Sequence, residues 1–304
     1  MRLAVLAFAA LLTSVSAFAQ DSLKSLAQGD EIVAGRSATT DPSITDRPAV
    51  KPIAVKKIVL VGDSTTQVNS GWGGAFCAYH VVSSLACVNL GRGGRSTYSY
   101  RAEGSWDVAL QEMKAGGYGA VYVLIQFGHN DQPGKAGRST NLETEFPVNL
   151  RQYISEARAA GAVPVLLTPL TRRNFAKGEL RDDLGPWAEK IRSVAAEMAV
   201  PLVDLYASSQ AAVQAMGPAG AARLAEISPP AEVLEAAKSG NVVSSATLPK
   251  PAPTQAALPP GPGGTFNQVF DYTHIGKAGA ETFSAIVADG LARAVPDLRK
   301  DILP

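Results

Sequence analysis

Three residues of this chain carry the side chains that serine-dependent acyl transfer requires. Ser64 follows the apolar run Ile58 to Val61, while Asp271 and His274 stand three residues apart near the C-terminus. A carboxylate bonded to one imidazole nitrogen fixes the tautomer and leaves the other nitrogen to take a proton from a serine hydroxyl. We therefore predict that Ser64 is a nucleophile, His274 its base and Asp271 the acid that orients the base.

The elements around Ser64 are expected to hold it at the edge of a sheet. Residues 58–61 are branched and apolar without alternation, which is typical of a strand covered on both faces of a parallel sheet. Gly62 permits a sharp bend, and the residues after it are helix-capping types that can open the helix following the strand. A glycine-bounded loop that holds Trp72 is expected before the helical pattern from Phe76. Ligands bind at this edge of open α/β sheets, although a serine here can also be a cap and nothing more.

Two further strands are expected to end in polar loops. Residues 86–90 lead into the glycine-rich stretch 91–96, which can aim backbone N–H groups at a ligand or serve as a simple turn. Residues 120–127 lead into Gly128-His129-Asn130-Asp131. The Asn130 amide can donate to an oxyanion there, although Asn and Asp are also ordinary turn residues.

The remaining pattern predicts one α/β domain over residues 55–304. Strands are expected at 163–167 and 201–206. Helices are expected through Phe76 to Leu85, at 146–160, 187–198 and within 207–238, and near the C-terminus around Phe283 to Leu291. Strands that alternate with helices indicate a three-layer αβα sandwich around a five-stranded parallel sheet. Residues 239–264 are dense in Gly, Ser and Pro and are expected to form a mobile insertion.

The N-terminus predicts export from the cell. Residues 1–19 combine Arg2, an apolar stretch and a small-x-small site ending at Ala19, so they are expected to be a cleaved signal peptide and the product secreted or periplasmic. Residues 20–54 are expected to be a leader across the surface. No later segment is long and apolar enough to predict a membrane span.

Charge and cysteine content limit the partners. The formal net charge is +1, and loss of the one positive charge of Arg2 with the signal peptide leaves a neutral chain. A neutral chain argues against nucleic acid, and we expect a monomer. Cys77 and Cys87 are the only cysteines; an oxidising compartment permits a disulfide between them, and the sequence leaves open whether one forms.

Together these motifs resemble the SGNH hydrolases, also called GDSL-type esterases. The matching blocks are Gly62-Asp63-Ser64, Asn89 with the loop to Gly94, Gly128-His129-Asn130-Asp131 and Asp271-x-x-His274. Within that superfamily the sequence is most similar to the rhamnogalacturonan acetylesterase group, as its segments GDST, GWG, GGRS and GHND indicate.

The resemblance, which spans about residues 56–295, implies a flavodoxin-like sheet and a serine esterase without metal or cofactor. It implies that Ser64 attacks, that His274 and Asp271 support it, and that the Ser64 and Gly94 N–H groups and the Asn130 amide form an oxyanion hole. The substrate would be an acetylated polysaccharide or oligosaccharide.

Arginines in the loops after the strands suggest the charge of that polymer. Their positions are Arg92, Arg95, Arg101, Arg138, Arg172 and Arg173. Guanidinium groups suit carboxylates, so a cleft rich in them would favour pectic chains, whereas loop arginines can also be merely solvated. We expect Arg95, Arg172, Arg173 and Trp72 to bind substrate.

Two other functions remain open from the sequence. A lipid or thioester hydrolase of the GDSL type would need a long apolar acyl channel, which a sequence does not reveal. An inactive carbohydrate-binding protein on the same fold would not require all of Ser64, Gly94, Asn130, Asp271 and His274. The complete set therefore favours an enzyme.

Overall fold

The computed structural model describes residues 55–244, 247–248 and 270–303. The expected signal peptide at 1–19, the expected leader at 20–54 and most of the segment expected to be mobile at 239–264 lie outside these residues. The description below concerns the compact unit Ile53–Pro304.

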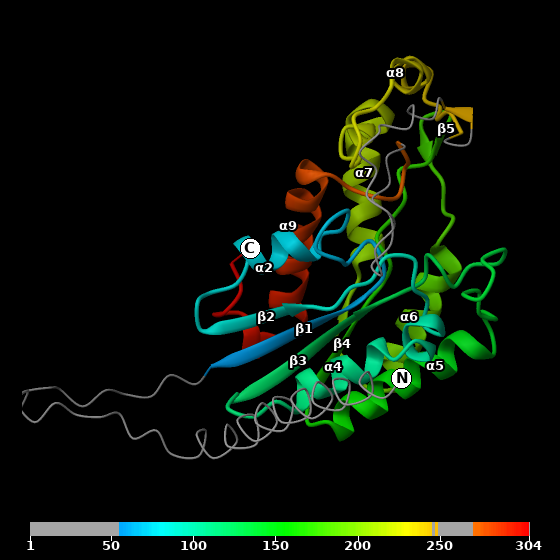
Figure 1. Ribbon diagram of the computed structural model, residues 1–304. Coiled ribbons are helices and arrows are strands. Elements are labelled where there is room, and N and C mark those ends of the chain that lie inside the picture. Colours follow the sequence, from blue (N-terminus) through cyan, green and yellow to red (C-terminus); the bar gives the residue numbers. More distant parts are fainter. Residues whose placement is uncertain (1–54, 245–246, 249–269, 304) are drawn as a thin grey trace, which may run out of the picture. The chain divides into compact units, whose positions relative to one another are not determined.

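A five-stranded parallel sheet forms the middle layer (Figure 1). Its strands are β1 (Lys56–Gly62), β2 (Leu85–Asn89), β3 (Ala120–Gln126), β4 (Val163–Leu167) and β7 (Leu202–Val203), in the spatial order β2-β1-β3-β4-β7. This is the flavodoxin-like order, in which the chain starts in the middle and the crevice opens at the carboxyl ends of β1 and β3. The predicted fold class is confirmed.

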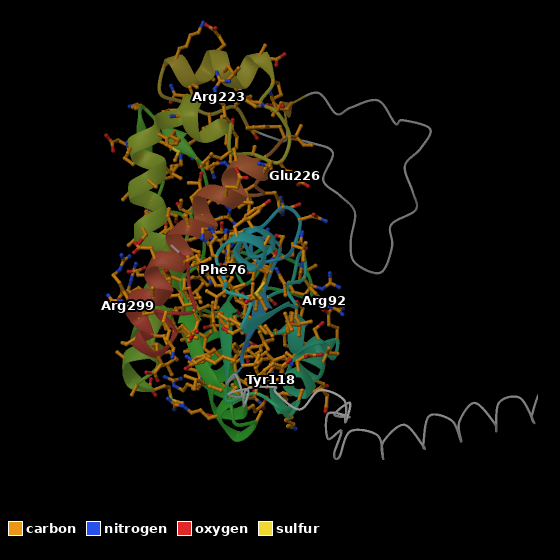
Figure 2. The ribbon with its side chains drawn as sticks, turned by 90° about the vertical axis from the view of Figure 1, so that its left-hand side faces the viewer. Phe76, Arg92, Tyr118, Arg223, Glu226 and Arg299 are labelled. Carbon is orange, nitrogen blue, oxygen red and sulfur yellow. A yellow bond between two sulfur atoms is a disulfide. The ribbon has the colours of Figure 1, made fainter. Side chains whose placement is uncertain are left out.

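Helices cover both faces of this sheet. One face packs against α2 (Gly73–Tyr79), α7 (Leu205–Ala222) and α9 (Lys277–Ala294), and the other against α4 (Ser105–Lys114), α5 (Glu145–Ala159) and α6 (Gly185–Glu197). Successive strand residues point to opposite faces, so Ile58 belongs to the first core and Val59 to the second. Phe76 of α2 lies in the first core (Figure 2).

Smaller elements complete the described part of the chain. They are α3 (Ser99–Ala102), the antiparallel pair β5 (Phe175–Ala176) and β6 (Glu179–Leu180), α8 (Ala231–Lys238) and the 3-10 helix η3 (Pro296–Leu298). None of the helices described is both long and apolar enough to cross a membrane.

The chain after Ser64 forms a turn and a loop before the next helix begins. A single turn forms first, in which the N–H groups of Thr66 and Gln67 donate to the Asp63 carbonyl, and α2 begins only at Gly73. The helix then ends at Tyr79 instead of continuing to Leu85, because Leu85 starts β2 and pairs with Lys56. The loop before the helix agrees with the expectation, whereas the expected C-terminal end of the helix at Leu85 was wrong.

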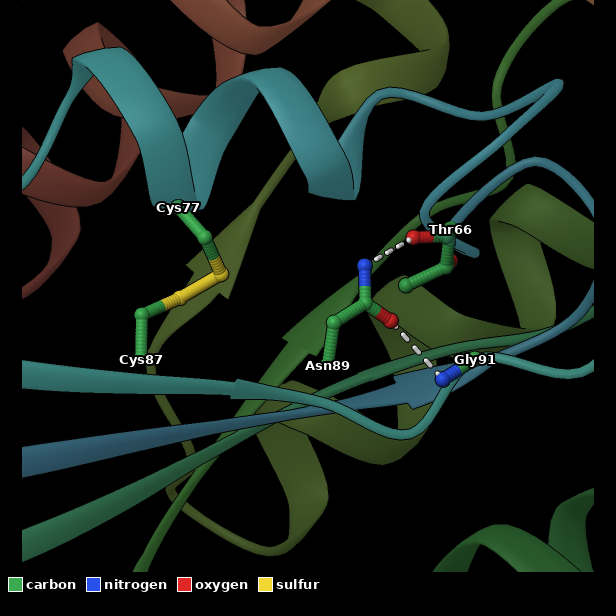
Figure 3. Close-up of a disulfide and its surroundings, with 5 residues drawn as sticks. All are labelled: Thr66, Cys77, Cys87, Asn89 and Gly91. Atoms are coloured by element: carbon green, nitrogen blue, oxygen red, sulfur yellow. Dashed lines mark hydrogen bonds between the residues drawn. A yellow bond between two sulfur atoms is a disulfide. The ribbon is translucent and has the colours of Figure 1, made fainter.

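A disulfide joins α2 to β2 (Figure 3). Cys77 lies on the helix and Cys87 on the strand, with their Cα atoms 5.5 Å apart. Beside it Asn89 donates from Nδ2 to the Thr66 carbonyl at 3.0 Å and accepts from the Gly91 N–H at 2.9 Å. Asn89 thus ties the turn after Ser64 to the glycine-rich loop.

Candidate active site

Ser64, His274 and Asp271 lie in one hydrogen-bonded row. His274 Nε2 is 2.9 Å from Ser64 Oγ, and His274 Nδ1 is 2.7 Å from Asp271 Oδ2. Ser64 follows β1, whereas the other two residues lie in the turn that leads into α9. The structure therefore brings together the three residues that the sequence singled out for nucleophile, base and orienting acid.

The turn from Asp271 to His274 holds its own carboxylate. Asp271 Oδ1 accepts the backbone N–H groups of Thr273 and His274, each at 2.7 Å. With Oδ1 held in this way, Oδ2 is directed to the imidazole. Burial alone would raise the pKa of Asp271, but the bonds from His274 and the His274 charge outweigh burial and lower the pKa. The carboxylate is thus ionised where it faces the ring.

The pKa of His274 is raised above the usual 6.5. Burial opposes this shift, but the hydrogen bond and charge of Asp271, together with the charges of Glu226 and Asp63, outweigh it. Glu226 (Figure 2) also accepts a hydrogen bond from Ser70 Oγ at 2.7 Å, and its backbone N–H donates to the His274 carbonyl at 3.3 Å. Sequence reasoning did not identify this carboxylate as a neighbour of His274.

Backbone crowding places Ser64 at the end of β1. A Cβ on Gly62 would lie 2.4 Å from Thr66 Oγ1 and 2.6 Å from the Gln126 carbonyl, so only glycine fits. Asp63 Oδ1 then accepts both the N–H and the hydroxyl of Thr65 at 2.8 Å. Those bonds fix the tight turn in which Ser64 sits.

A buried polar chain supports this turn from behind. Gln126 at the end of β3 donates from Nε2 to Thr65 Oγ1 at 2.5 Å and accepts from Trp72 Nε1 at 2.6 Å. Trp72 is 0% exposed, which corrects the expectation that it binds substrate. Gln126 was missed, although a glutamine inside an otherwise apolar strand was an available signal.

Gly94 and Asn130 both belong to the loops that border Ser64. The Asn130 amide donates from Nδ2 to the carbonyl of Arg95 at 3.0 Å, and Arg95 directly follows Gly94 in the sequence. His129, the residue before Asn130, has Nδ1 3.5 Å from Oδ2 of Asp63, the residue before Ser64. The loop that carries Gly94 is thus bonded to the loop that carries Asn130, and that loop in turn contacts the residue before Ser64.

Two buried acids behind these loops have pKa values shifted in opposite directions. Burial would raise the pKa of Asp63, but the charge and hydrogen bond of His129 and the bonds from Thr65 outweigh burial, so the pKa of Asp63 is lowered. Burial also lowers the pKa of His129. Asp131 is buried too, and burial raises its pKa to about 7 against the bonds that it accepts from Thr97 and Thr140. Asp131 thus ties the loop after β2 to the loop after β3.

The four expected arginine and tryptophan ligands are not equally accessible. Arg95 bonds Glu103 and the Gly93 carbonyl, and Arg172 pairs with Asp183 at 2.7 Å. Arg173 is 1% exposed, and its guanidinium is directed at backbone carbonyls of the turn before α9. Its burial corrects the expectation that Arg173 binds substrate.

Two other cations stand in the loop after β3 without a carboxylate partner in the described residues. Arg138 donates from Nη1 to the Gly94 carbonyl at 3.2 Å. Burial, and then the charges of Arg172 and Arg138, lower the pKa of Lys135 against the opposing charge of Asp63. Lys135 was missed by the sequence analysis. Arg92 lies exposed at the surface (Figure 2).

Within the ranges that the structure describes, no group of three or more His, Cys, Asp or Glu side chains is placed to hold a metal ion.

Comparison with known proteins identifies relatives of the part of the chain that carries Ser64 and Asn130. The model of the GDSL-like lipase/acylhydrolase family matches residues 60–223. The rhamnogalacturonan acetylesterase RhgT of Bacillus subtilis (strain 168) is 34% identical over 182 residues, which are 57% of this chain and 74% of that protein. The probable rhamnogalacturonan acetylesterase YesY of the same strain is 33% identical over 160 residues, which are 51% of this chain and 72% of that protein.

A solved structure agrees with the fold. The crystal structure of the YxiM protein of Bacillus subtilis superposes with a TM-score of 0.56 at 22% identity, over 80% of this chain and 58% of that chain. Identity at this level speaks for the fold alone. The family model covers more than half of the chain, from β1 to the end of α7. The chain therefore belongs to the GDSL-like lipase/acylhydrolase family and is a carboxylic ester hydrolase.

Proposed function

We propose that this enzyme is a serine acetylesterase that removes acetyl groups from a plant cell-wall polysaccharide. The observation that carries the proposal is the hydrogen-bonded row of Ser64, His274 and Asp271. The names of the similar Bacillus subtilis proteins support acetate as the acyl group and a pectic chain as the polymer. The signal peptide expected at residues 1–19 would bring the enzyme to a polymer that lies outside the cell.

In the proposed reaction, His274 Nε2 takes the proton of Ser64 Oγ as the oxygen attacks the acetyl carbonyl. Asp271 stabilises the imidazolium that forms. The N–H groups of Ser64 and Gly94 and the Asn130 amide hold the negative oxygen of the tetrahedral intermediate. His274 then gives its proton to the departing sugar hydroxyl, and water hydrolyses the acetyl-enzyme with the same residue as base.

Acetate release tests the triad. Ser64→Ala and His274→Ala should each lower kcat by several orders of magnitude, and Asp271→Asn should cost less than either because it preserves geometry but loses the charge. Acetate released from acetylated pectin, acetylated xylan and a short aryl acetate would be measured for each variant. A fully active His274→Ala enzyme would overturn the proposal, and a preference for long acyl chains would favour a lipid hydrolase.

Cations beside the site support a polyanionic substrate. Arg95 and Arg172 have acidic partners, so their charges are partly balanced. Lys135 and Arg138, which form no ion pair within the described residues, add positive charge to the loop that follows Asn130. We propose that this loop attracts the carboxylates of a galacturonate-containing chain.

Salt dependence tests that proposal. The value of kcat/KM on acetylated pectin should fall as ionic strength rises, whereas that on a neutral aryl acetate should stay nearly constant. The double variant Lys135→Gln/Arg138→Gln should flatten the dependence on pectin. A control with the same change in net charge is Lys238→Gln/Arg293→Gln, whose cations pair within α8 and α9. Equal efficiency on pectin and xylan without a salt effect would remove the pectic assignment.

A further inference from the structure

Arg173 contacts every backbone carbonyl of the turn from Asp271 to His274. Its own backbone N–H donates to the Tyr272 carbonyl at 2.9 Å. Its guanidinium donates from Nη1 to Thr273 O at 3.2 Å and from Nη2 to Asp271 O at 3.1 Å and His274 O at 2.8 Å. One residue from the loop after β4 thus holds four consecutive peptide groups.

This contact is unusual in its chemistry. Arg173 is 1% exposed, and no carboxylate in the described residues lies within ion-pair distance of it. Burial lowers its pKa to about 10, and the nearby charge of Asp271 opposes that shift. A buried cation costs free energy unless its donors are satisfied, so a neutral side chain would be the simpler way to fill this space. The rigid fork of the guanidinium, however, reaches several carbonyls at once, which an ammonium group does not.

The position of the turn decides the geometry of the proposed triad. Asp271 and His274 both lie in it, and Ser64 comes from β1 on a separate segment. The only described side-chain bond from the turn to Ser64 is the one from His274 Nε2 at 2.9 Å. Movement of the turn by about 1 Å would separate Nε2 from Oγ, and misplacement of this size costs about a hundredfold in rate.

We propose that Arg173 is a positioning residue, which locks the Asp271–His274 turn so that the imidazole meets Ser64. The inference rests on the proposed triad. Arg173 does not touch substrate; it acts through the peptide groups of the turn. Its loss should therefore lower kcat and leave KM for a small aryl acetate nearly unchanged, because the acyl pocket itself keeps its residues.

The test uses three variants and a matched control in the full chain. Arg173→Gln keeps an amide donor, Arg173→Lys keeps the charge and Arg173→Met keeps only bulk. The control is Arg158→Gln, since Arg158, at the end of α5, also donates to two backbone carbonyls, those of Met198 and Ala199 just after α6. Far-UV circular dichroism and thermal melting establish which variants fold.

Two readouts separate positioning from general stability. The first is kcat on the aryl acetate, expected to fall about a hundredfold in Arg173→Gln and less in Arg173→Lys, and to stay at the wild-type value in Arg158→Gln. The second is the far-downfield proton NMR signal of an imidazole N–H bonded to a carboxylate, assigned by its absence in Asp271→Asn. It should be lost or weakened in Arg173→Gln and kept in Arg158→Gln.

The outcomes distinguish this inference from the proposed function. A wild-type enzyme that is no faster than Ser64→Ala would defeat the proposed triad whatever Arg173 does. An active wild type with a folded Arg173→Gln variant of normal kcat and normal downfield signal would overturn the positioning role alone. Failure of all three Arg173 variants to fold would also overturn it, because the residue would then serve global stability.

Discussion

The side-chain amide of Asn130 is held by the backbone carbonyl of Arg95, to which Nδ2 donates at 3.0 Å. An amide nitrogen carries two N–H donors, and this bond uses one of them. The bond fixes the amide plane and so fixes the direction of the second donor. Because the loop that carries Arg95 also carries Gly94, a single contact orients two of the three proposed oxyanion donors relative to each other.

Loss of this amide should appear in the chemical step. We expect Asn130→Ala to lower kcat about a hundredfold with a modest change in KM, because the donor is engaged mainly in the transition state. Steady-state kinetics on a short aryl acetate measures both constants. A change confined to KM would make Asn130 a substrate-binding residue instead.

The pH dependence of kcat/KM should report His274. The imidazole accepts the Ser64 proton only when neutral, and its pKa is raised above 6.5, chiefly by Asp271 against the opposing effect of burial. Activity should therefore be lost as the pH falls through a value above 6.5. Glu226→Gln keeps the bond to Ser70 but removes one negative charge, so the acid limb should move to lower pH.

The control for this measurement is Glu232→Gln on α8, an exposed carboxylate in another part of the chain. It should leave the limb in place. A limb that Glu226→Gln leaves unmoved or shifts upward would contradict the electrostatic role of Glu226.

Asp131 should make folding stability depend on pH. Burial raises its pKa from 3.8 to about 7, so the folded state binds more protons than the unfolded state between these values. The stabilisation from Asp131 is fully present below the pKa of the unfolded state and is lost as the pH rises through about 7. The free energy lost is on the order of a few kcal/mol. Asp131→Asn is neutral throughout and should lack that loss. Urea unfolding at pH 5 and pH 8 measures the difference, and parallel losses in both proteins would contradict it.

The Cys77–Cys87 bond should stabilise the fold. The two cysteines are 10 residues apart in sequence, and closing a loop of that length in the unfolded chain is worth about 3 kcal/mol. The double variant Cys77→Ala/Cys87→Ala should lose about that much free energy of unfolding in urea and keep its kcat. Wild-type protein unfolded under reducing conditions provides the comparison, and equal stability in all three cases would show that the bond is not stabilising.

Local patterns in the sequence were enough to predict the sheet and the row of Ser64, His274 and Asp271. An unbroken apolar run predicts a buried strand by itself, and the carboxyl ends of parallel strands meet at one edge, so polar residues after several strands converge. Asp271 and His274 are near neighbours in the chain, and their contact is local. The family match over residues 60–223 confirms the family resemblance and covers its first three blocks, whereas Asp271-x-x-His274 lies outside that range.

Burial and pairing were decided only by the tertiary structure. Trp72 and Arg173 both fall in loops, where a sequence predicts exposure, yet Trp72 reaches Gln126 54 residues away and Arg173 reaches His274 101 residues away. The turn after Ser64 is likewise held from outside, because the Trp72 N–H bonds the Thr65 carbonyl and Asn89 bonds that of Thr66. Residue type and spacing determine which chemistry is possible, but whether a side chain meets solvent or a distant backbone depends on which remote segments pack against it, and that is settled only when the layers come together.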